Sequence, residues 1–322
     1  MWDFGGVQVR SHSEKPCFSG LGAYPARAGT GFNEKVFSLN LERPRQIVSD
    51  CRPILIAMRR IQFIEFHEQS WFPPTLRNDV TDALQCGSEV LKAYAPISLM
   101  LQQALDATQS TAIVDLCPGS GGPWLDLSQK LQGNTVAYRI WLTDKFPNLV
   151  AFENVKAVSA NGIDFCRSSV DAMKVPIELD GFRTMFSSFH HFPPAQARAI
   201  LQNAVDARQG IGIFEITSRT ALAVGMMFLW FLTPFAFTPS IRPFRWSRLL
   251  YTYVFPIIPL VLLFDGLVSC LRTYRTRELR ELIEELATSE YWREVGEQSG
   301  TFGSLPVTYL IGYPRERAKV SL

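Results

Sequence analysis

The sequence contains little charge and no pattern typical of a disulfide framework or a metal site. Charged residues make up 19% of the 322 residues, and the formal net charge is +2. Because there is no basic stripe, we do not expect nucleic acid as a substrate. The six cysteines include no C-x-x-C pair, which indicates reduced thiols in a cytoplasmic protein. The four histidines show no H-x-x-x-H spacing, so the sequence predicts no metal site.

Residues 1–57 lack any periodicity of apolar residues. They mix Gly, Pro, Ser and Arg, and they have neither the charged start nor the apolar run of a secretory signal. We therefore expect an irregular N-terminal extension. Residues 58–110 are expected to form a helical cap, with helical stretches between Leu76 and Ala107. The approach to these helices is rich in side chains that suit either a pocket lining or a docked loop: Glu65, His67, Glu68 and Trp71.

The segment T-A-I-V-D-L-C-P-G-S-G-G-P, residues 111–123, is the most informative stretch. Its apolar run, Ala112–Leu116, predicts a buried parallel strand. Gly119 and Gly121 allow the backbone to come close to a ligand. A proline then suits the first turn of a helix over Trp124–Leu131. A strand, a glycine-rich turn and a helix form the usual cradle for a nucleotide-like cofactor in an open α/β sheet.

The spacing within this segment favours one family. A glycine follows Asp115 at the fourth position, whereas a dinucleotide fingerprint places its first glycine directly after the strand. The pattern D-x-x-x-G-x-G resembles the first motif of the class I S-adenosylmethionine-dependent methyltransferases. The resemblance implies S-adenosylmethionine as cofactor, with Asp115, Gly119 and Gly121 around its methionine part. Cys117 is then a small residue near the cofactor rather than a nucleophile.

Strand and helix patterns alternate after this motif, which favours βαβ units and a parallel sheet. The predicted strands are Val136–Thr143, Ile163–Val170, Phe182–Ser188 and Ile211–Ile216, and the predicted helices are Asn148–Ala160 and Pro194–Ala207. Asp144 ends the second strand, where this family and the dinucleotide enzymes place a carboxylate on ribose hydroxyls. The resemblance also implies that Asp171 lies in the adenine-contacting segment and that Ser187 lies beside the cofactor.

The C-terminal part completes the predicted fold. A helix capped by Thr276 precedes two strands, Tyr291–Glu297 and Val307–Gly312, which resemble the final antiparallel hairpin of the family. The sequence thus predicts an α/β, Rossmann-like, seven-stranded and mostly parallel sheet with helices on both faces. The cofactor-binding core is expected over residues 111–217, with its last helix and strand pair in residues 265–322.

A hydrophobic insertion, residues 218–264, follows the fifth strand. Ala221–Pro239 runs for 19 residues without a charge and Leu249–Phe264 for 16, so a helical hairpin is expected. The turn between them carries three arginines, Arg242, Arg245 and Arg248. A spanning hairpin would carry these arginines across the bilayer, against the positive-inside tendency. A shallow hairpin explains the pattern better, with membrane surface contact through residues 221–264 and with Trp230, Trp246 and the arginines at the headgroup level. A buried lid over a substrate cavity is the alternative.

Methyl transfer requires a group that removes a proton from the acceptor. His190 and His191 follow the fourth strand and are the candidate bases, since imidazole titrates near neutrality. Glu215, at the end of the fifth strand, is a further catalytic candidate, and as a buried carboxylate it should have a partner, with Arg219 or an arginine of the insertion expected.

The insertion is expected beside the acceptor site, because ligands bind beyond the carboxyl ends of the strands in this fold. The acceptor is therefore expected to be small and hydrophobic or lipid-like. Two alternatives stay open: an NAD(P)-dependent oxidoreductase, and a non-catalytic membrane-associated protein that binds a nucleotide-like cofactor.

Overall fold

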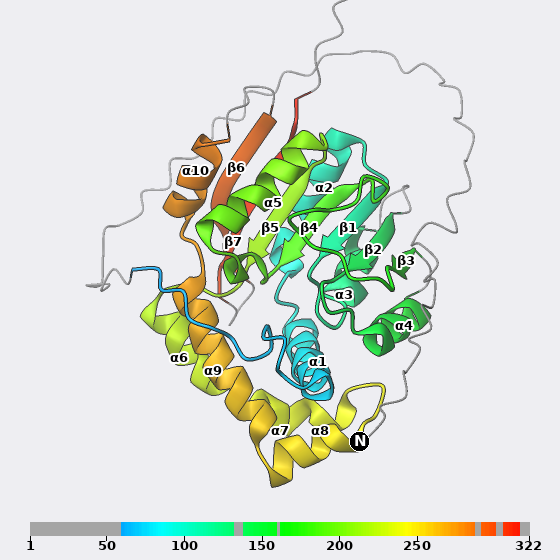
Figure 1. Cartoon of the computed structure of the whole chain (residues 1–322), viewed down its shortest axis with the longest axis vertical. Helices are drawn as coiled ribbons and strands as arrows, with labels where there is room; N and C mark the ends of the chain where they lie inside the picture. The colour runs from blue at the N-terminus through cyan, green and yellow to red at the C-terminus, as the bar shows by residue number, and fades with distance from the viewer. Residues whose placement is uncertain (1–58, 132–137, 160–161, 287–290, 301–304, 316–322) are drawn as a thin grey trace, which may run out of the picture. The chain divides into compact units, whose positions relative to one another are not determined.

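A seven-stranded sheet organises the computed structural model, which describes residues 59–131, 138–159, 162–286, 291–300 and 305–315. The predicted N-terminal extension lies outside the described residues. The strands follow the order β3-β2-β1-β4-β5-β7-β6 (Figure 1). They are β1 (Ala112–Leu116), β2 (Arg139–Thr143), β3 (Ile163–Phe165), β4 (Phe182–Phe186), β5 (Ile211–Glu215), β6 (Tyr291–Gln298) and β7 (Val307–Pro314).

The sheet is mostly parallel. The first five strands pair in parallel, while β7 runs antiparallel to both β5 and β6. β4 and β5 are buried along their whole length, as expected where helices cover both faces. The strand order reverses between β1 and β4, and such a reversal opens a crevice at the carboxyl ends of the strands. These features confirm the predicted α/β, Rossmann-like fold.

Helices cover both faces of the sheet (Figure 1). On one face, Leu101, Trp124 and Phe152 belong to a single core cluster with side chains of the strands. Full burial of a large apolar side chain stabilises a fold by about 1.5–3 kcal/mol. The helices of this face are α2 (Ser98–Thr108), α3 (Trp124–Leu131) and α4 (Leu149–Val158). On the other face lie α5 (Pro194–Asp206) and α10 (Thr276–Glu284), which contact each other.

Two predicted boundaries need correction. The third strand ends at Phe165 rather than Val170, because the Val170 N–H leaves the ladder and donates to the Asp144 carbonyl at 2.9 Å. Helix α10 begins at Thr276, so Arg275 rather than Thr276 occupies the cap position. The Glu278 carboxylate accepts from the Arg275 N–H at 2.8 Å, which satisfies one backbone donor that the helix leaves free.

Helix α1 (Pro74–Val90) precedes the sheet and lies within residues 58–110, where a helical cap is expected. Pro74 occupies its first turn, where the missing N–H costs nothing. A short 3-10 turn, Ala95–Ile97, directly precedes α2 in the connection from α1. The buried side of α1 contributes Val80 to an apolar cluster with Ile258 of the insertion region. The cap therefore connects the insertion to the sheet.

The insertion is broken into shorter helices rather than forming a two-helix hairpin. It contains α6 (Ala221–Trp230), α7 (Thr233–Phe237), α8 (Trp246–Leu249) and a π-helical turn, Leu250–Val254, and it continues into α9 (Ile257–Arg272). The helical segments on either side of Pro256 meet at 77°. A proline prevents a continuous helix at this point. Helix α9 also extends beyond Phe264, the expected end of the insertion.

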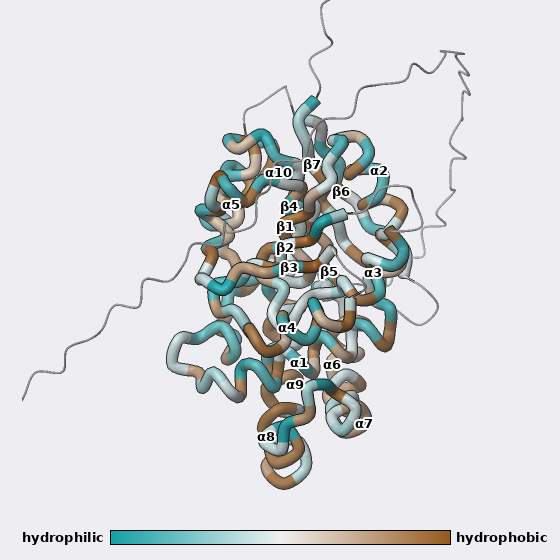
Figure 2. The backbone as a smooth tube through the Cα atoms, turned by 90° about the vertical axis from the view of Figure 1, so that its right-hand side faces the viewer, coloured by the Kyte–Doolittle hydropathy of each residue, from teal (hydrophilic) through white to brown (hydrophobic). Residues whose placement is uncertain are grey.

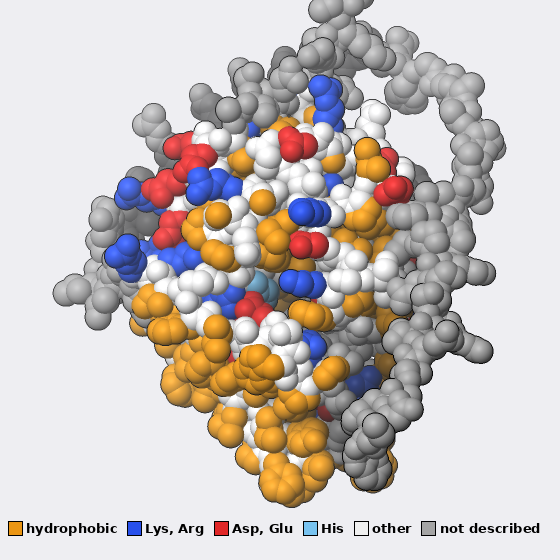
Figure 3. Space-filling view, viewed as in Figure 1, with side chains coloured by type: hydrophobic (Ala, Val, Ile, Leu, Met, Phe, Trp, Pro, Cys, Tyr) orange, Lys and Arg blue, Asp and Glu red, His pale blue; other side chains and the backbone are white. Residues whose placement is uncertain are grey.

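Large apolar side chains cover the outer surface of the insertion. Figure 2 shows hydrophobic chain around α7 and α8, at the end remote from the sheet, and Figure 3 shows hydrophobic side chains gathered over the same end. Residues Ala221–Ser240 form a helical stretch apolar and long enough to cross a membrane, and 22% of its most apolar window is buried. A helix at the core of a soluble protein would be mostly buried instead.

Candidate functional site

The glycine loop after β1, defined here as residues 117–122, turns through left-handed backbone. Gly119 has φ of +62°, Gly121 +127° and Gly122 +62°, and Cys117 also has a positive φ, of 60°. Asp144, which follows β2, accepts the Gly119 N–H at 3.0 Å and thereby fixes the loop. Burial raises the pKa of Asp144, and the N–H groups of Phe146 and Gly119 oppose that rise.

The buried Asp115 carboxylate packs directly against the glycine loop. Its carboxylate accepts from the Trp124 indole N–H at 2.6 Å and from the Thr184 hydroxyl at 2.8 Å. Complete burial raises its pKa to about 7, although these two donors lower it. A Cβ on Gly122 would lie 2.8 Å from the Asp115 Oδ2. The carboxylate is therefore occupied by protein donors, and it sets the shape of the loop.

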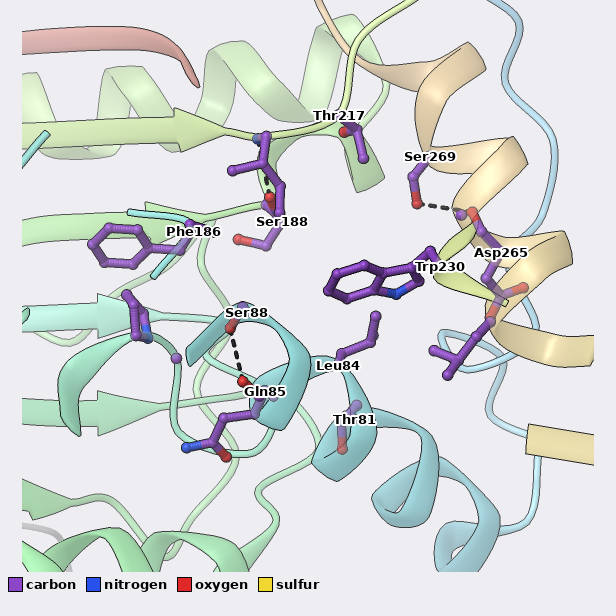
Figure 4. A pocket seen from close by; sticks show the side chains of 18 of the residues that line it. Thr81, Leu84, Gln85, Ser88, Phe186, Ser188, Thr217, Trp230, Asp265 and Ser269 are labelled. Atoms are coloured by element: carbon purple, nitrogen blue, oxygen red, sulfur yellow. Dashed lines mark hydrogen bonds between the residues drawn. The ribbon is translucent and has the colours of Figure 1, made fainter. Parts of the chain in front are cut away.

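A cavity of about 420 Å³ opens beside the glycine loop. Pro118, Gly119 and Gly122 line one side of it, and Ser187 and Ser188 line it from the end of β4. Figure 4 shows Thr81, Leu84, Gln85 and Ser88 approaching from α1, with Trp230 reaching in from the insertion side. The volume falls within the range of about 300–1,000 Å³ that small-molecule sites occupy.

The insertion forms the apolar wall of this cavity. Met226, Met227, Leu229 and Trp230 come from α6, and Leu262 comes from α9. The Trp230 ring packs on α1, because a Cβ on Gly87 would lie 2.7 Å from it. The cavity is thus polar at the glycine loop and apolar toward the insertion.

The predicted site residues divide into two groups. Those that line the cavity are Cys117, Gly119, Ser187, His190 and His191. Those outside the lining are Asp115, Gly121, Asp144, Asp171 and Glu215. Ser187 accepts the Tyr94 hydroxyl at 2.7 Å. The Asp171 carboxylate accepts the Met173 N–H at 2.8 Å and so stabilises a turn.

Gly121 packs closely within the folded chain. A Cβ there would lie 2.7 Å from the Val155 Cγ2, and its φ of +127° disfavours any other residue. Packing of the loop against α4 and the backbone conformation therefore both require glycine at position 121.

A polar cluster, defined as Glu65, Glu68, His190 and His191, lies at the end of the cavity toward α9. His191 Nδ1 contacts Glu68 Oε1 and lies 3.3 Å from Glu65 Oε2. His190 Nε2 lies 3.6 Å from Glu65 Oε1. Arg272 holds the cluster from the other side, since its Nη1 lies 2.9 Å from Glu68 Oε2 and 3.3 Å from Glu65 Oε1.

The pKa values in the polar cluster reflect this pairing. Burial would raise the pKa of Glu65, but His191 and His190 bring it well below its usual range. For Glu68, burial is likewise outweighed, chiefly by His191, and the pKa falls to about 2. Burial would lower the pKa of His191, yet Glu65 and Glu68 raise it to about 10. Glu215 similarly raises the pKa of His190 against burial.

The partner of Glu215 is a histidine rather than the expected arginine. His190 Nδ1 lies 2.7 Å from Glu215 Oε2, and the His190 N–H donates to Glu215 Oε1 at 3.1 Å. Arg219 instead pairs with Glu278. Because β5 ends beside the turn that follows β4, the histidine is the nearer partner for the carboxylate.

Several residues of the site had no clear signal in the sequence. Arg272, Asp265 and Ser269 lie on one face of α9 and reach the cavity or the polar cluster, although this helix starts inside the hydrophobic insertion. Asp265 accepts the Phe66 N–H at 2.8 Å and thereby ties α9 to the segment before α1. The spacing of Asp265, Ser269 and Arg272 at helical intervals is the one feature that could have indicated a shared face.

No family model and no curated protein sequence matches the chain. Similar solved structures include the plantazolicin methyltransferase BpumL in complex with SAH, at 9% identity and a TM-score of 0.49, covering 77% of this chain and 94% of that chain. A putative O-methyltransferase from Nostoc punctiforme is similar at 14% identity and a TM-score of 0.43, covering 73% and 59%. Human N-acetylserotonin methyltransferase in complex with SAM is similar at 14% identity and a TM-score of 0.43, covering 76% and 57%.

The chain thus spans less than two thirds of the last two proteins. At such identities the likeness concerns the fold alone. The strand order, with its final antiparallel pair, agrees with it. The sheet by itself shows an α/β, Rossmann-like fold that ends in the antiparallel strand pair expected from the sequence.

Proposed function

We propose that the protein is an S-adenosylmethionine-dependent methyltransferase that acts on a small hydrophobic or lipid-like acceptor. The observation that carries this proposal is the cavity, which extends from the glycine loop to the apolar wall of the insertion. Methyl transfer needs two reactants aligned in a space that excludes water. The cavity offers backbone and hydroxyl groups at one end for the cofactor and an apolar surface at the other for the acceptor.

The glycine loop fits the polar part of such a cofactor. At Gly119 the position of a Cβ is open except for Thr81 at 3.6 Å, so the backbone can approach a ligand there. Ser187 and the Tyr94 hydroxyl lie at the same end of the cavity. The half-buried Asp144 stands next to the loop and is the carboxylate assigned to the ribose hydroxyls.

The bound cofactor would supply a methyl group on a positively charged sulfur. In the transfer, the bond from carbon to sulfur breaks with its electron pair left on sulfur, and a bond forms from that carbon to the nucleophilic atom of the acceptor. The acceptor loses one proton. The protein therefore has to orient both molecules, exclude water and receive this proton.

The polar cluster is the proposed place of acceptor activation, since Glu65, His190 and His191 line the cavity. A direct base must start without the proton it is to receive. With a pKa of about 10, His191 is protonated at neutral pH in the cluster as it stands, and Glu215 raises the pKa of His190 as well while it orients the ring. Direct proton transfer to either imidazole therefore requires that this imidazole first lose its own proton. Activation through a bound cation is the other route.

The outer surface of the insertion supports membrane contact. Trp246 is 77% exposed, Leu222 66%, Val254 64% and Phe255 57%. Exposed apolar surface of this kind is stabilised at the boundary between headgroups and acyl chains. An apolar acceptor dissolved in the membrane would then lie close to the apolar wall of the cavity. We accordingly place the protein in the cytoplasm, at the membrane surface.

The arginines of the insertion support a shallow position over a spanning one, although not in the predicted way. Arg248 is buried and paired with Asp82 of α1, and Arg245 Nη1 lies 3.6 Å from Asp79 Oδ1. The turn between the apolar segments therefore lies against the catalytic unit and not across a bilayer from it. Of the three arginines, Arg242 is left exposed for lipid headgroups.

Calorimetry with S-adenosylhomocysteine and NAD, measured side by side, tests the proposed cofactor. S-adenosylhomocysteine should bind and NAD should not. Gly122→Ala should weaken S-adenosylhomocysteine binding at least tenfold, because its Cβ would press on Asp115 at a φ of +62°. Gly225→Ala is the matched control, since a Cβ at Gly225 meets nothing within 4 Å.

Binding of NAD in place of S-adenosylhomocysteine would replace the proposal with the oxidoreductase alternative. S-adenosylhomocysteine binding that is unchanged in a folded Gly122→Ala variant would show that the cofactor does not use this loop. Methylation of membrane extracts can be followed with a radiolabelled methyl group. Tight cofactor binding without any such methylation would favour the non-catalytic alternative.

A further inference from the structure

Four side-chain atoms of the polar cluster make no hydrogen bond within the described residues, although each is buried. They are Glu65 Oε2, Glu68 Oε1, His190 Nε2 and His191 Nδ1. The side chain of Glu65 is 0% exposed and that of His190 is 2% exposed. Leaving one buried polar atom without a hydrogen bond costs about 1–3 kcal/mol. These atoms do lie close together, since His191 Nδ1 contacts Glu68 Oε1 and lies 3.3 Å from Glu65 Oε2, and one common partner would satisfy all four.

The remaining polar atoms of these side chains are already held by protein groups. Glu65 Oε1 accepts the Ser269 hydroxyl at 3.0 Å, and Glu68 Oε2 accepts from Arg272 at 2.9 Å. His190 Nδ1 is paired with Glu215 at 2.7 Å. Glu65, Glu68 and His190 are thus each oriented by a second group through one polar atom, which leaves the other atom without a hydrogen bond. Ligands of metal ions in proteins are oriented in this way, and an imidazole paired with a carboxylate is the commonest form.

We propose that the polar cluster binds one divalent transition-metal cation, with Glu65, His190 and His191 as its ligands and Glu68 at its edge. The ligand atoms of the first three residues lie within 4.8 Å of one another. Two ligands that are each about 2.0–2.2 Å from one ion stand at most about 4.4 Å apart. The separation of 3.3 Å between Glu65 Oε2 and His191 Nδ1 lies within that limit, and His190 Nε2 lies 3.6 Å from the other oxygen of the same carboxylate, Oε1.

The ligand types favour particular ions. Two imidazoles and one carboxylate suit Fe²⁺, Mn²⁺, Co²⁺ or Zn²⁺, whereas Mg²⁺ and Ca²⁺ prefer oxygen ligands throughout. The net charge of the side chains around the site also favours a divalent ion. Glu65, Glu68 and Glu215 bring three negative charges and Arg272 brings one positive charge, so the group carries two negative charges when the imidazoles are neutral. Asp265 is not counted in this sum, because its carboxylate is paired with the Phe66 N–H and the His67 ring.

The site is placed to act on the acceptor. Because Glu65, His190 and His191 line the cavity, a cation between them would face the acceptor and could bind its nucleophilic atom directly. Such binding lowers the pKa of the acceptor without using either imidazole as a base. This role rests on the proposed methyl transfer, but the binding of the cation does not, so the two can fail separately.

Co²⁺ titration of the full chain, freed of metal with a chelator, tests the site by absorption spectroscopy. Co²⁺ reports its own ligands through its visible spectrum, with no need for activity. One Co²⁺ should bind per chain. His190→Gln and His191→Gln should each lower the affinity at least tenfold. Glu215→Gln should lower it by about 10- to 100-fold through loss of the group that orients His190.

His67→Gln is the matched control. Its ring lies 5.5 Å from that of His191, but its Nδ1 is paired with Asp265 at 2.7 Å, and it is not one of the three ligands. Co²⁺ affinity should therefore stay unchanged in this variant. Glu68→Gln, at a position 23% exposed, provides a variant for the case in which the buried histidine variants do not fold, and it should weaken Co²⁺ binding.

Three results would overturn the cation site. They are an absence of saturable Co²⁺ binding, unchanged affinity in both folded histidine variants, and a loss of affinity in His67→Gln equal to that in His191→Gln. Cofactor binding measured on the same samples separates this outcome from failure of the proposed function, since none of the three proposed ligands belongs to the glycine loop.

Discussion

Replacing Arg248 by methionine should destabilise the protein far more than replacing an exposed arginine of the same turn. Arg248 is 1% exposed. It pairs with Asp82, its Nε lies 3.7 Å from Asp79 Oδ1, and it donates to the carbonyls of Ile241 and Pro243, each at 3.2 Å. This one side chain therefore joins the turn of the insertion to α1.

The magnitude follows from the charges that the substitution leaves behind. Methionine keeps much of the volume but leaves Asp82 and Asp79 buried without their guanidinium. Removing one partner of a buried pair costs about 3–5 kcal/mol. A domain has about 5–15 kcal/mol of stability in total, so the loss is a large fraction, and it corresponds to a fall in Tm of roughly 10 °C for a unit of this size.

The deficit should also depend on pH. Burial raises the pKa of Asp79, while Ser247, Arg248 and Arg245 lower it. Loss of Arg248 raises that pKa further above its unfolded value. A carboxyl with a raised folded pKa stabilises less as pH rises through that pKa, so the variant should be closer to wild type at about pH 5 than at about pH 8.

Urea unfolding followed by tryptophan fluorescence, in the same detergent for all variants, measures these differences. Arg242→Met is the control, because Arg242 is exposed and should change stability by no more than about 0.5 kcal/mol. Asp82→Asn combined with Arg248→Met completes a double-mutant cycle, and the two should couple by at least about 1 kcal/mol. An Arg248→Met variant within 1 kcal/mol of wild type at about pH 8 would refute the proposed attachment of the insertion to α1.

Three further predictions concern acidity, the membrane and the cavity. Burial raises the pKa of Glu89 from 4.5 to about 7, so stability should fall as pH rises through this range, and Glu89→Gln should abolish that fall and gain up to about 3 kcal/mol at about pH 8 in thermal unfolding. In flotation with anionic vesicles, Trp246→Ser combined with Phe255→Ser should release the protein, whereas Ile177→Ser, 84% exposed and outside the insertion, should not; equal binding of all three proteins contradicts membrane contact. Trp230→Ala should raise the KM for an apolar acceptor and leave S-adenosylhomocysteine affinity unchanged, and the reverse pattern would place Trp230 in the cofactor site.

Local sequence patterns were sufficient for the sheet. The boundaries of β1 and α3 agree with the predicted residues, because an apolar run, a glycine turn and a proline each act within a few positions. The third strand was predicted too long, since apolar residues beyond Phe165 are buried by the loop and not by the ladder. A run of apolar residues indicates that the segment is buried, but a buried segment need not pair as a strand.

The polar cluster could not be predicted in the same way. Its histidines and glutamates come from segments far apart in the chain, and Arg272 comes from a third. Each segment by itself has an ordinary alternative role: Glu65 and Glu68 suit a surface loop, and paired histidines suit a turn before proline. The convergence depends on how α9 packs against the segment before α1, which is a tertiary contact without a local signal. The absence of a recognisable metal-ligand spacing therefore said little about whether the folded chain gathers metal ligands.

The surroundings of the insertion also could not be predicted from its sequence alone. Helix α6 is apolar on all sides, so its sequence suits a buried helix and a membrane helix equally. In the structure Met227 and Trp230 face the cavity, while Leu222 and Phe228 lie exposed on the outside. One helix can thus have an apolar inner side for the acceptor and an apolar outer side for lipid, separated by its own diameter of about 10 Å. An acceptor that moved from membrane to cavity would pass from one apolar surface to another without entering water, and this path would account for a hydrophobic insertion in the proposed methyltransferase.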